Sequence, residues 1–254
     1  MRKRKPSAPL ALQLDDLKNS REKIEDYLNN YLLNASVFAT FMHSQIKRDA
    51  NREYIKIASY QYLSSLITCW ETYFRDVFIF LNTIDKKFQN QIIRLLNISD
   101  EQKVEIESQL PLEDYLASCI NFQNFEEVKK AFFPLLNSDI FQAIGKDTFL
   151  TLMTKSNKKV VFCMERTFPD YYDILSESIE KRHKFIHDAN FIRKQTLNIH
   201  FIQKAESILL FCPQIFSRII SEKYNLIRYI IESEGEFEYI FTIEDLIATD
   251  WIIK

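Results

Sequence analysis

The sequence contains very little glycine. Only Gly145 and Gly235 occur in 254 residues. Tight hairpins and phosphate-binding loops usually depend on glycine, and the chain has neither a GxxxxGK[ST] loop nor a GxGxxG turn. This scarcity favours a mostly helical fold and excludes nucleotide binding through either of these two loops.

Cysteine is also sparse, and the four cysteines lie far apart with no CxxC pair. They are Cys69, Cys119, Cys163 and Cys212. This spacing is not that of a zinc knuckle, and it fits reduced thiols in the core of a cytoplasmic protein. Carboxylate or Cys/His clusters that would hold a metal are also not visible in the sequence. We therefore expect neither a metal nor another cofactor.

Neither sign of charge dominates, and no hydrophobic run is long. The formal net charge of −2 gives no general attraction to nucleic acid or to an anionic membrane. No stretch approaches the length of a membrane span. The apolar run near the start ends at Asp15 and Asp16, which makes it too short for a secretory signal. We expect a cytoplasmic protein without membrane association, in which residues 1–9 form a disordered basic tail.

The chain is rich in apolar residues, at 46%, and their spacing is helical. Residues 10–48 predict one or two helices, and residues 51–81 carry the strongest helical pattern in the chain. One apolar face of this second segment is marked by Leu63, Leu66, Trp70, Phe74, Val77, Phe78 and Leu81. These two segments are expected to begin the main bundle.

Shorter helices are expected between residues 85 and 168. Asn97 is predicted to end a helix, Ser99 or Asp100 to cap the next one, and Pro111 and Pro134 to mark further starts or stops. KSNKK, residues 155–159, has the composition of a basic loop. We expect this segment to be a helical insertion packed on the bundle.

The C-terminal half predicts three more long helices. Pro169 precedes acidic residues and is expected to open a helix that ends near residues 188–190. Two further helices are predicted over residues 195–212 and from Pro213 to about 232. The extension 233–254 is ambiguous, because EFEYIFTI suits a strand and IEDLIATDWII a last helix.

EKRHKFIHDAN, residues 180–190, is the candidate site, because it combines an Arg with two of the four His. In an ideal helix His183 lies on an apolar stripe, with Arg182 and His187 on its two flanks. The stripe consists of Tyr172, Leu175, Ile179 and Ile186. The spacing predicts that these polar groups point toward the bundle. Two interpretations remain at this point, a functional site and a buried, hydrogen-bonded structural histidine.

A metal pair formed by His183 and His187 is disfavoured. No Glu follows the first His as in HExxH, and Arg182 and Lys184 would repel a cation.

RHKFIH resembles the R-x(4–6)-H motif of the HEPN superfamily (higher eukaryote and prokaryote nucleotide-binding domains). LITCWETYFRDVF, residues 66–78, is similar to the HEPN helix that carries an aromatic–Glu pair followed by an Asp. INFQNFEEVKKAFFPLLNSDIFQAI, residues 120–144, resembles the segment before the motif helix in the RiboL-PSP-like HEPN branch. The resemblance covers about residues 55–232.

The resemblance implies an all-α fold, a HEPN-type bundle of four to five long helices. The insertion 85–168 would lie between the second and third main helices of a single domain, residues 1–254. It also implies a homodimer in which two motif helices form one composite cleft. Many members are metal-independent endoribonucleases in toxin–antitoxin or anti-phage systems, so a cognate antitoxin or defence partner is also implied. Other members have lost catalysis and bind RNA, nucleotide or a partner protein.

The implied chemistry uses the ribose 2′-OH of RNA as the nucleophile. His187 would be the general acid/base, because histidine titrates near physiological pH. Arg182 would hold the scissile phosphate through its planar fork. His183 would orient the phosphate or form a hydrogen bond across the dimer, and a satisfied interface residue is its alternative. Glu71 would pair with Arg182 or orient His187, and an i,i+4 pair with Arg75 is its alternative.

Substrate contact is assigned to Lys181, Lys184, Asn190 and Asp76. Each also has a simpler interpretation. The two lysines are solvated charges, Asp76 is a surface acid, and Asn190 ends the helix in the left-handed conformation. A third hypothesis for the whole protein is a structural interaction bundle in which the motif is a polar network in the core.

Overall fold

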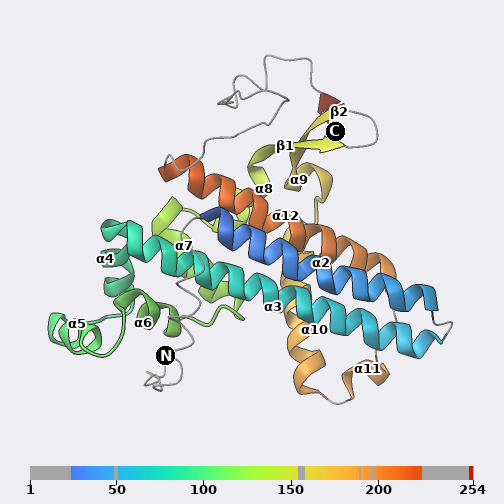
Figure 1. The fold of residues 1–254 in the computed structure, drawn as a ribbon, viewed down its shortest axis with the longest axis horizontal. Coiled ribbons are helices and arrows are strands. Elements are labelled where there is room, and N and C mark those ends of the chain that lie inside the picture. Colours follow the sequence, from blue (N-terminus) through green and yellow to red (C-terminus); the bar gives the residue numbers. More distant parts are fainter. Residues whose placement is uncertain are drawn as a thin grey trace.

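The computed structural model describes residues 24–48, 51–153, 158–188, 190–194, 198–224 and 252–253, together with residue 196. This part of the chain is mostly helical, as the sequence predicts (Figure 1). The helices are α2 (Ile24–Arg48), α3 (Arg52–Ile84), α4 (Lys86–Leu95), α5 (Asp100–Glu107), α6 (Leu112–Ser118), α7 (Phe125–Leu136), α8 (Ile140–Lys146), α9 (Met164–Thr167), α10 (Tyr171–His187), α11 (Phe191–Lys194) and α12 (Ile199–Tyr224). None of the helices in these ranges is both long and apolar enough to cross a membrane.

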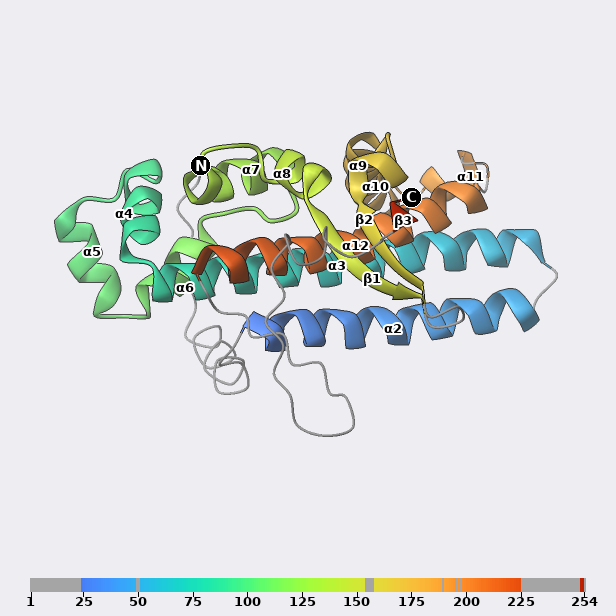
Figure 2. The same ribbon diagram turned by 90° about the horizontal axis from the view of Figure 1, so that it is seen from above.

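Helix α3 is the centre of the bundle. It contacts α2, α10 and α12 along its length and α4, α6 and α7 toward its C-terminal end. Figure 2 shows α2 and α10 on opposite sides of the pair formed by α3 and α12. This position requires apolar residues on several faces of α3, and the helix buries the whole stripe that the sequence marks, from Leu63 to Leu81. The predicted helix over 51–81 is confirmed, with Asn51 as its N-cap.

Helix α12 is continuous through Pro213, which corrects the prediction of two helices divided there. Proline has no N–H, so the carbonyl group of Leu209 loses its usual partner in the helix. The Tyr31 hydroxyl of α2 donates to that carbonyl over 2.6 Å. The Tyr73 hydroxyl of α3 donates to the Pro213 carbonyl over 2.9 Å. Two tyrosines from neighbouring helices thus donate hydrogen bonds to α12 beside the proline, where the backbone hydrogen bonding of the helix is interrupted. Buried residues before and after Pro213 also hold α12 against the bundle.

The segment between α3 and α10 contains the short helices that the turn residues predict. Asn97 is left-handed after α4, and Ser99 forms a capping box with Gln102 at the start of α5. The expectation for Pro134 is wrong, because Pro134 lies inside α7, which continues to Leu136. Burial of Phe132 and Leu135 on either side of Pro134 outweighs the loss of one hydrogen bond.

A small sheet departs from the all-α expectation. Strand β1 (Thr148–Met153) pairs antiparallel with β2 (Lys158–Cys163), and β3 (Ile252–Ile253) pairs parallel with β2. TFLTLM and KKVVFC are rich in β-branched and aromatic residues, which favour strands even without glycine in the flanking positions. Lys158 and Lys159 of the predicted basic loop therefore begin a strand, and the segment 85–168 is not purely helical. The extension 233–254 is ambiguous in sequence between a strand and a last helix, and at Ile252 and Ile253 it forms a strand.

An aromatic core joins α3 to the helices around it. Phe74 of α3 stacks on Phe216 of α12 and contacts Trp70, and Phe141 of α8 packs on both Trp70 and Phe74. One of the two glycines has a steric role here. A side chain at Gly145 of α8 would overlap the ring of Tyr171 at the start of α10. Glycine at this position lets α10 approach α8 closely.

Several predictions concern residues outside the described part. These are the basic tail 1–9, the helix expected over 10–23, the end of the helix expected up to 232, and all of the extension 233–254 except its two strand residues.

Candidate functional site

Helix α10 carries the RHKFIH segment and packs on α3 and α12. Its buried residues are Tyr171, Ile174, Leu175, Ser178, Ile179 and Arg182. Arg182 therefore faces the bundle as the sequence predicts. The prediction is wrong for His183, His187 and Ile186, which are exposed. The reason is that the face of α10 that packs on the bundle continues through Ser178 and Arg182 to Phe185, which contacts Tyr60 of α3. This face is rotated from the predicted stripe, so His183, Ile186 and His187 turn to solvent.

Arg182 forms an ion pair with Glu71 in the interior of the bundle. Its Nη2 atom donates to Glu71 Oε2 over 3.4 Å, and the two residues retain only 8% and 3% of their exposed surface. The Nε atom of Arg182 has no hydrogen-bond partner within the described ranges. Glu71 therefore pairs with Arg182 of α10, which is one of its two predicted partners, and not with His187. The alternative for Glu71, an i,i+4 ion pair with Arg75, is not formed, although Arg75 is close enough to act on the Glu71 charge.

Burial raises the pKa of Glu71 to about 7, even though Arg182, Arg75 and the nearby Gln123 side chain all oppose the shift. Loss of hydration therefore outweighs the attraction of the two arginines. The carboxyl group consequently changes charge near neutral pH, and the strength of its pair with Arg182 changes with it.

His183 and His187 lie next to each other on the solvent side of α10. They are one helical turn apart, and their ring centroids are separated by 4.6 Å at an interplanar angle of 49°. Both rings are open to solvent. This arrangement rules out the interpretation of either as a buried structural histidine. It leaves two adjacent imidazoles accessible to a ligand or to another protein.

The end of α10 is held by aromatic contacts of one residue between the two histidines in sequence and one residue after them. Phe185 stacks on Tyr60 of α3 at 6.2 Å between centroids, and Phe191 of α11 meets the edge of the same Tyr60 ring at 5.4 Å. Tyr60 is buried. This anchor fixes the last turn of α10 although most of its surface is exposed. Sequence reasoning missed Tyr60, because its contacts join residues more than a hundred positions apart.

The predicted substrate-binding lysines are both engaged on their own helix. Lys181 pairs with Glu177 over 3.1 Å and lies over the Phe201 ring. Lys184 pairs with Glu180 and is exposed beside the histidines. Exposed i,i+4 pairs of this kind contribute only a few tenths of a kcal/mol, about 0.3–0.5. Lys184 can therefore turn toward an anion at little cost.

Asn190 does not end the helix, which corrects the prediction of a left-handed cap. Helix α10 stops at His187, and Asp188 caps it in an extended conformation. The Asp188 carboxylate accepts a hydrogen bond from the Asn190 backbone N–H over 2.9 Å, which forms a short turn instead. Asn190 is exposed beyond this turn.

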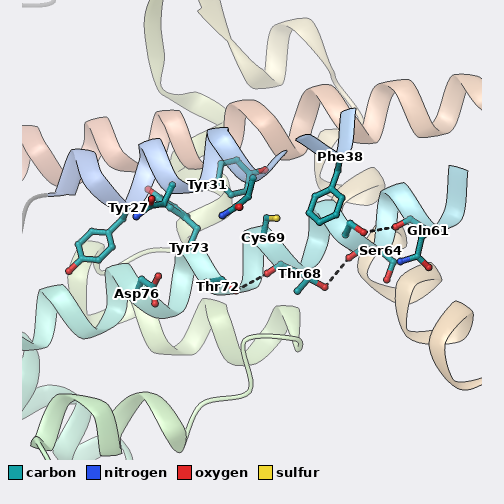
Figure 3. A pocket seen from close by; sticks show the side chains of 13 residues that line it. Tyr27, Tyr31, Phe38, Gln61, Ser64, Thr68, Cys69, Thr72, Tyr73 and Asp76 are labelled. Atoms are coloured by element: carbon teal, nitrogen blue, oxygen red, sulfur yellow. Dashed lines mark hydrogen bonds between the residues drawn. The ribbon is translucent and has the colours of Figure 1, made fainter. Parts of the chain in front are cut away.

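Asp76 lies apart from the other candidate residues. It lines a groove of about 290 Å³ between α2 and α3, at the end where Tyr27 lies (Figure 3). Uncharged polar side chains make up most of the lining, with Gln61 and Phe38 at the far end. The structure thus brings together Arg182 with Glu71 and His183 with His187, but it does not place Asp76 with them.

No group of three or more His, Cys, Asp or Glu side chains that could hold a metal ion occurs in the described ranges. The chain matches no family model, no curated protein and no solved structure.

Proposed function

We propose that this chain is a metal-independent endoribonuclease of HEPN type that acts as a dimer. The observation that carries the proposal is the pair of adjacent, exposed imidazoles of His183 and His187 on a helix end fixed by packing. Proton transfer needs a histidine that a substrate can reach, and positioning needs a rigid support. The proposed setting is a toxin–antitoxin or anti-phage system, with RNA as the substrate.

In the proposed reaction, His187 removes the proton from a ribose 2′-OH. The 2′-oxygen forms a bond to the phosphorus atom and the bond to the 5′-oxygen breaks. That oxygen takes up a proton from water, which leaves a 2′,3′-cyclic phosphate and a 5′-OH end, and His187 later returns its proton to solvent. His183 is positioned to contact the same phosphate, because its ring adjoins that of His187. Lys184, exposed beside both, supplies a positive charge.

Arg182 is the proposed phosphate ligand. In the structure its guanidinium is paired with Glu71, so it must leave this pair to bind a phosphate. The guanidinium must exchange the Glu71 carboxylate for a phosphate oxygen. Because the pKa of Glu71 is raised to about 7, a large share of the carboxyl groups is protonated near neutral pH. A neutral Glu71 holds Arg182 less strongly. The raised pKa therefore supports release of Arg182 toward the exposed end of α10.

Dimer formation through α10 is proposed on the basis of its exposed last turn. Ile186 lies between the two histidines in sequence and is 48% exposed. An exposed isoleucine in the same turn as polar functional groups is a typical interface residue. Two copies of this turn facing each other would place four imidazoles around one substrate.

A second candidate is a non-catalytic HEPN module that binds RNA, nucleotide or a partner protein. The burial of Arg182 favours it, because an arginine committed to Glu71 serves the fold instead of a phosphate. In this case the exposed end of α10 is a binding surface without chemistry.

The experiment that separates the two is RNA cleavage by the purified full chain in EDTA. We expect cleavage by the wild type and a loss of about 10²–10⁴-fold in His187→Ala. The matched control is His200→Ala, which removes an exposed histidine of α12. Equal cleavage by His187→Ala and His200→Ala, or no cleavage of cellular RNA by the wild type, would overturn the enzyme and leave the binding module.

A further inference from the structure

Helix α2 presents an apolar stripe to solvent. Leu33, Val37 and Phe41 are spaced four residues apart and are 66%, 65% and 53% exposed. With the exposed Asn34 and Thr40 between them, they form a surface that we name the α2 face. It spans about 12 Å along the helix, at 1.5 Å per residue. Three large apolar side chains on one exposed helix face are unusual in a protein that acts alone.

The α2 face also lacks charge. Residues 27–46 contain no Asp, Glu, Lys or Arg, and neither do residues 57–70 of α3, although 27% of the chain is charged. The groove between these two helices has mostly uncharged polar lining, with Asn, Gln, Ser and Thr side chains along its length and one acid, Asp76, at one end (Figure 3). The solvent face of a surface helix normally carries charges, and the cores of protein interfaces are depleted of them. The composition of the α2 face is that of an interface.

The ends of the helix suggest which partner fits. Glu25 and Asp26 open α2, and Lys47 and Arg48 close it. If two copies of α2 lie antiparallel about a two-fold axis at Val37, Leu33 of one copy meets Phe41 of the other. Asp26 then lies at the level of Arg48 on the partner helix. Acidic residues at the start of a helix and basic residues at its end also interact favourably with the helix dipole. The charges therefore indicate a partner only in combination with the uncharged, apolar centre of α2.

The polar side chains of the α2 face fit the same arrangement. An asparagine amide both donates and accepts hydrogen bonds. In the antiparallel pair Asn34 lies opposite Thr40, whose hydroxyl group already donates to its own helix at Ser36 and can still accept. A surface built from apolar, amide and hydroxyl groups meets its own copy without opposing like charges.

We propose that the α2 face binds a second copy of this chain through an antiparallel pairing of α2 with α2. This interface is separate from any contact through α10, because α2 and α10 lie on opposite sides of the pair formed by α3 and α12 (Figure 2). The proposal is independent of the endoribonuclease activity. If both faces are used, each chain has two neighbours and the assembly is larger than a dimer.

The first test measures the mass of the full chain in solution over a range of concentrations. Val37→Glu would place two like charges on the two-fold axis, and we expect it to weaken the association by roughly tenfold or more. The matched control is Val104→Glu on α5, because Val104 is 69% exposed and lies away from α2. A third variant, Ile186→Glu, reports on α10. A wild type that stays monomeric, or a Val37→Glu chain that associates like Val104→Glu, would overturn the proposal.

The second test measures the register by oxidation of single-cysteine substitutions. A disulfide requires Cα atoms within about 7 Å, and a two-fold axis at Val37 brings only that residue close to its own copy. We expect Val37→Cys to form a cross-linked dimer. Leu33→Cys should not, because its two copies would lie about 12 Å apart along the helix axis. Wild type and Val104→Cys give the background from the native cysteines. Equal cross-linking of Val37→Cys and Val104→Cys would contradict the pairing, and cross-linking of Leu33→Cys would contradict its antiparallel register.

Discussion

Arg182 of α10 donates a hydrogen bond to Glu71 of α3 over 3.4 Å, and both side chains are buried. This contact joins the motif helix to the central helix of the bundle across more than a hundred residues of sequence. It also pairs the residue that precedes His183 on α10 with a carboxyl group of α3 whose pKa is about 7. The fold and the proposed chemistry therefore share one residue pair, and variants of that pair test both.

Removal of Arg182 is expected to destabilise the fold. In Arg182→Ala the Glu71 carboxyl group stays buried without its main partner, which typically costs about 3–5 kcal/mol. Urea unfolding followed by circular dichroism measures the loss. Arg193→Ala provides the control, since Arg193 is exposed on α11 and should change the free energy of unfolding by less than about 0.5 kcal/mol. Similar stabilities of the two variants would show that the pair contributes nothing to the fold.

Glu71 is expected to make stability depend on pH. Its pKa is raised from 4.5 to about 7 on folding, so the folded state holds the proton more tightly than the unfolded state. This contribution to stability is fully present below about pH 4.5 and is lost as the pH rises through 7. Its full size is up to about 3 kcal/mol.

The measurement compares the free energy of unfolding of wild type and Glu71→Gln between pH 4.5 and 8. Glutamine does not titrate, so the wild type should lose stability relative to the variant as the pH rises. Glu177→Gln on the exposed side of α10 controls for the loss of a carboxylate. Parallel pH profiles of wild type and Glu71→Gln would mean that Glu71 does not titrate in this range.

Tyr31 is expected to support the proline in α12. Tyr31→Phe removes the donor to the Leu209 carbonyl, which Pro213 cannot replace, and a buried unsatisfied acceptor costs about 1–3 kcal/mol. Thermal or urea unfolding measures this loss. Tyr54→Phe is the control, because Tyr54 is exposed on α3. If Pro213→Ala restores most of the stability of Tyr31→Phe, the explanation holds; an equal loss in both proline and alanine backgrounds argues against it.

Residues whose structure depends on local sequence could be predicted. The stripe from Leu63 to Leu81 has a period of 3.6, and the Ser99 capping box acts within four residues, so both are encoded locally. Pro213 was misleading because its effect depends on Tyr31, which lies far away in the chain. The strand from Lys158 to Cys163 was missed because its first two residues resemble a basic loop.

In the candidate site, too, the features set by local sequence could be predicted and those set by tertiary contacts could not. Helical spacing correctly predicted that Arg182 faces the bundle. Ser178 and Ile179, about one turn before it on the same face, are also buried. It failed at the next residue, His183, and one turn further at His187, because the predicted stripe was rotated from the face that packs on the bundle, which includes Phe185. Tyr60 and Gln123 reach the site only through tertiary packing. No local pattern marks them.

We propose that the exposed histidine pair promotes attack by a ribose 2′-OH. The most direct measurement uses an oligonucleotide that the wild type cleaves in EDTA and a matched copy with a single 2′-deoxyribose on the 5′ side of the cleaved bond. We expect a 2′,3′-cyclic phosphate end from the first oligonucleotide, no cleavage at that bond in the second, and no cleavage of either by His187→Ala. Cleavage of the deoxy-substituted bond, or unchanged cleavage by His187→Ala, would contradict it.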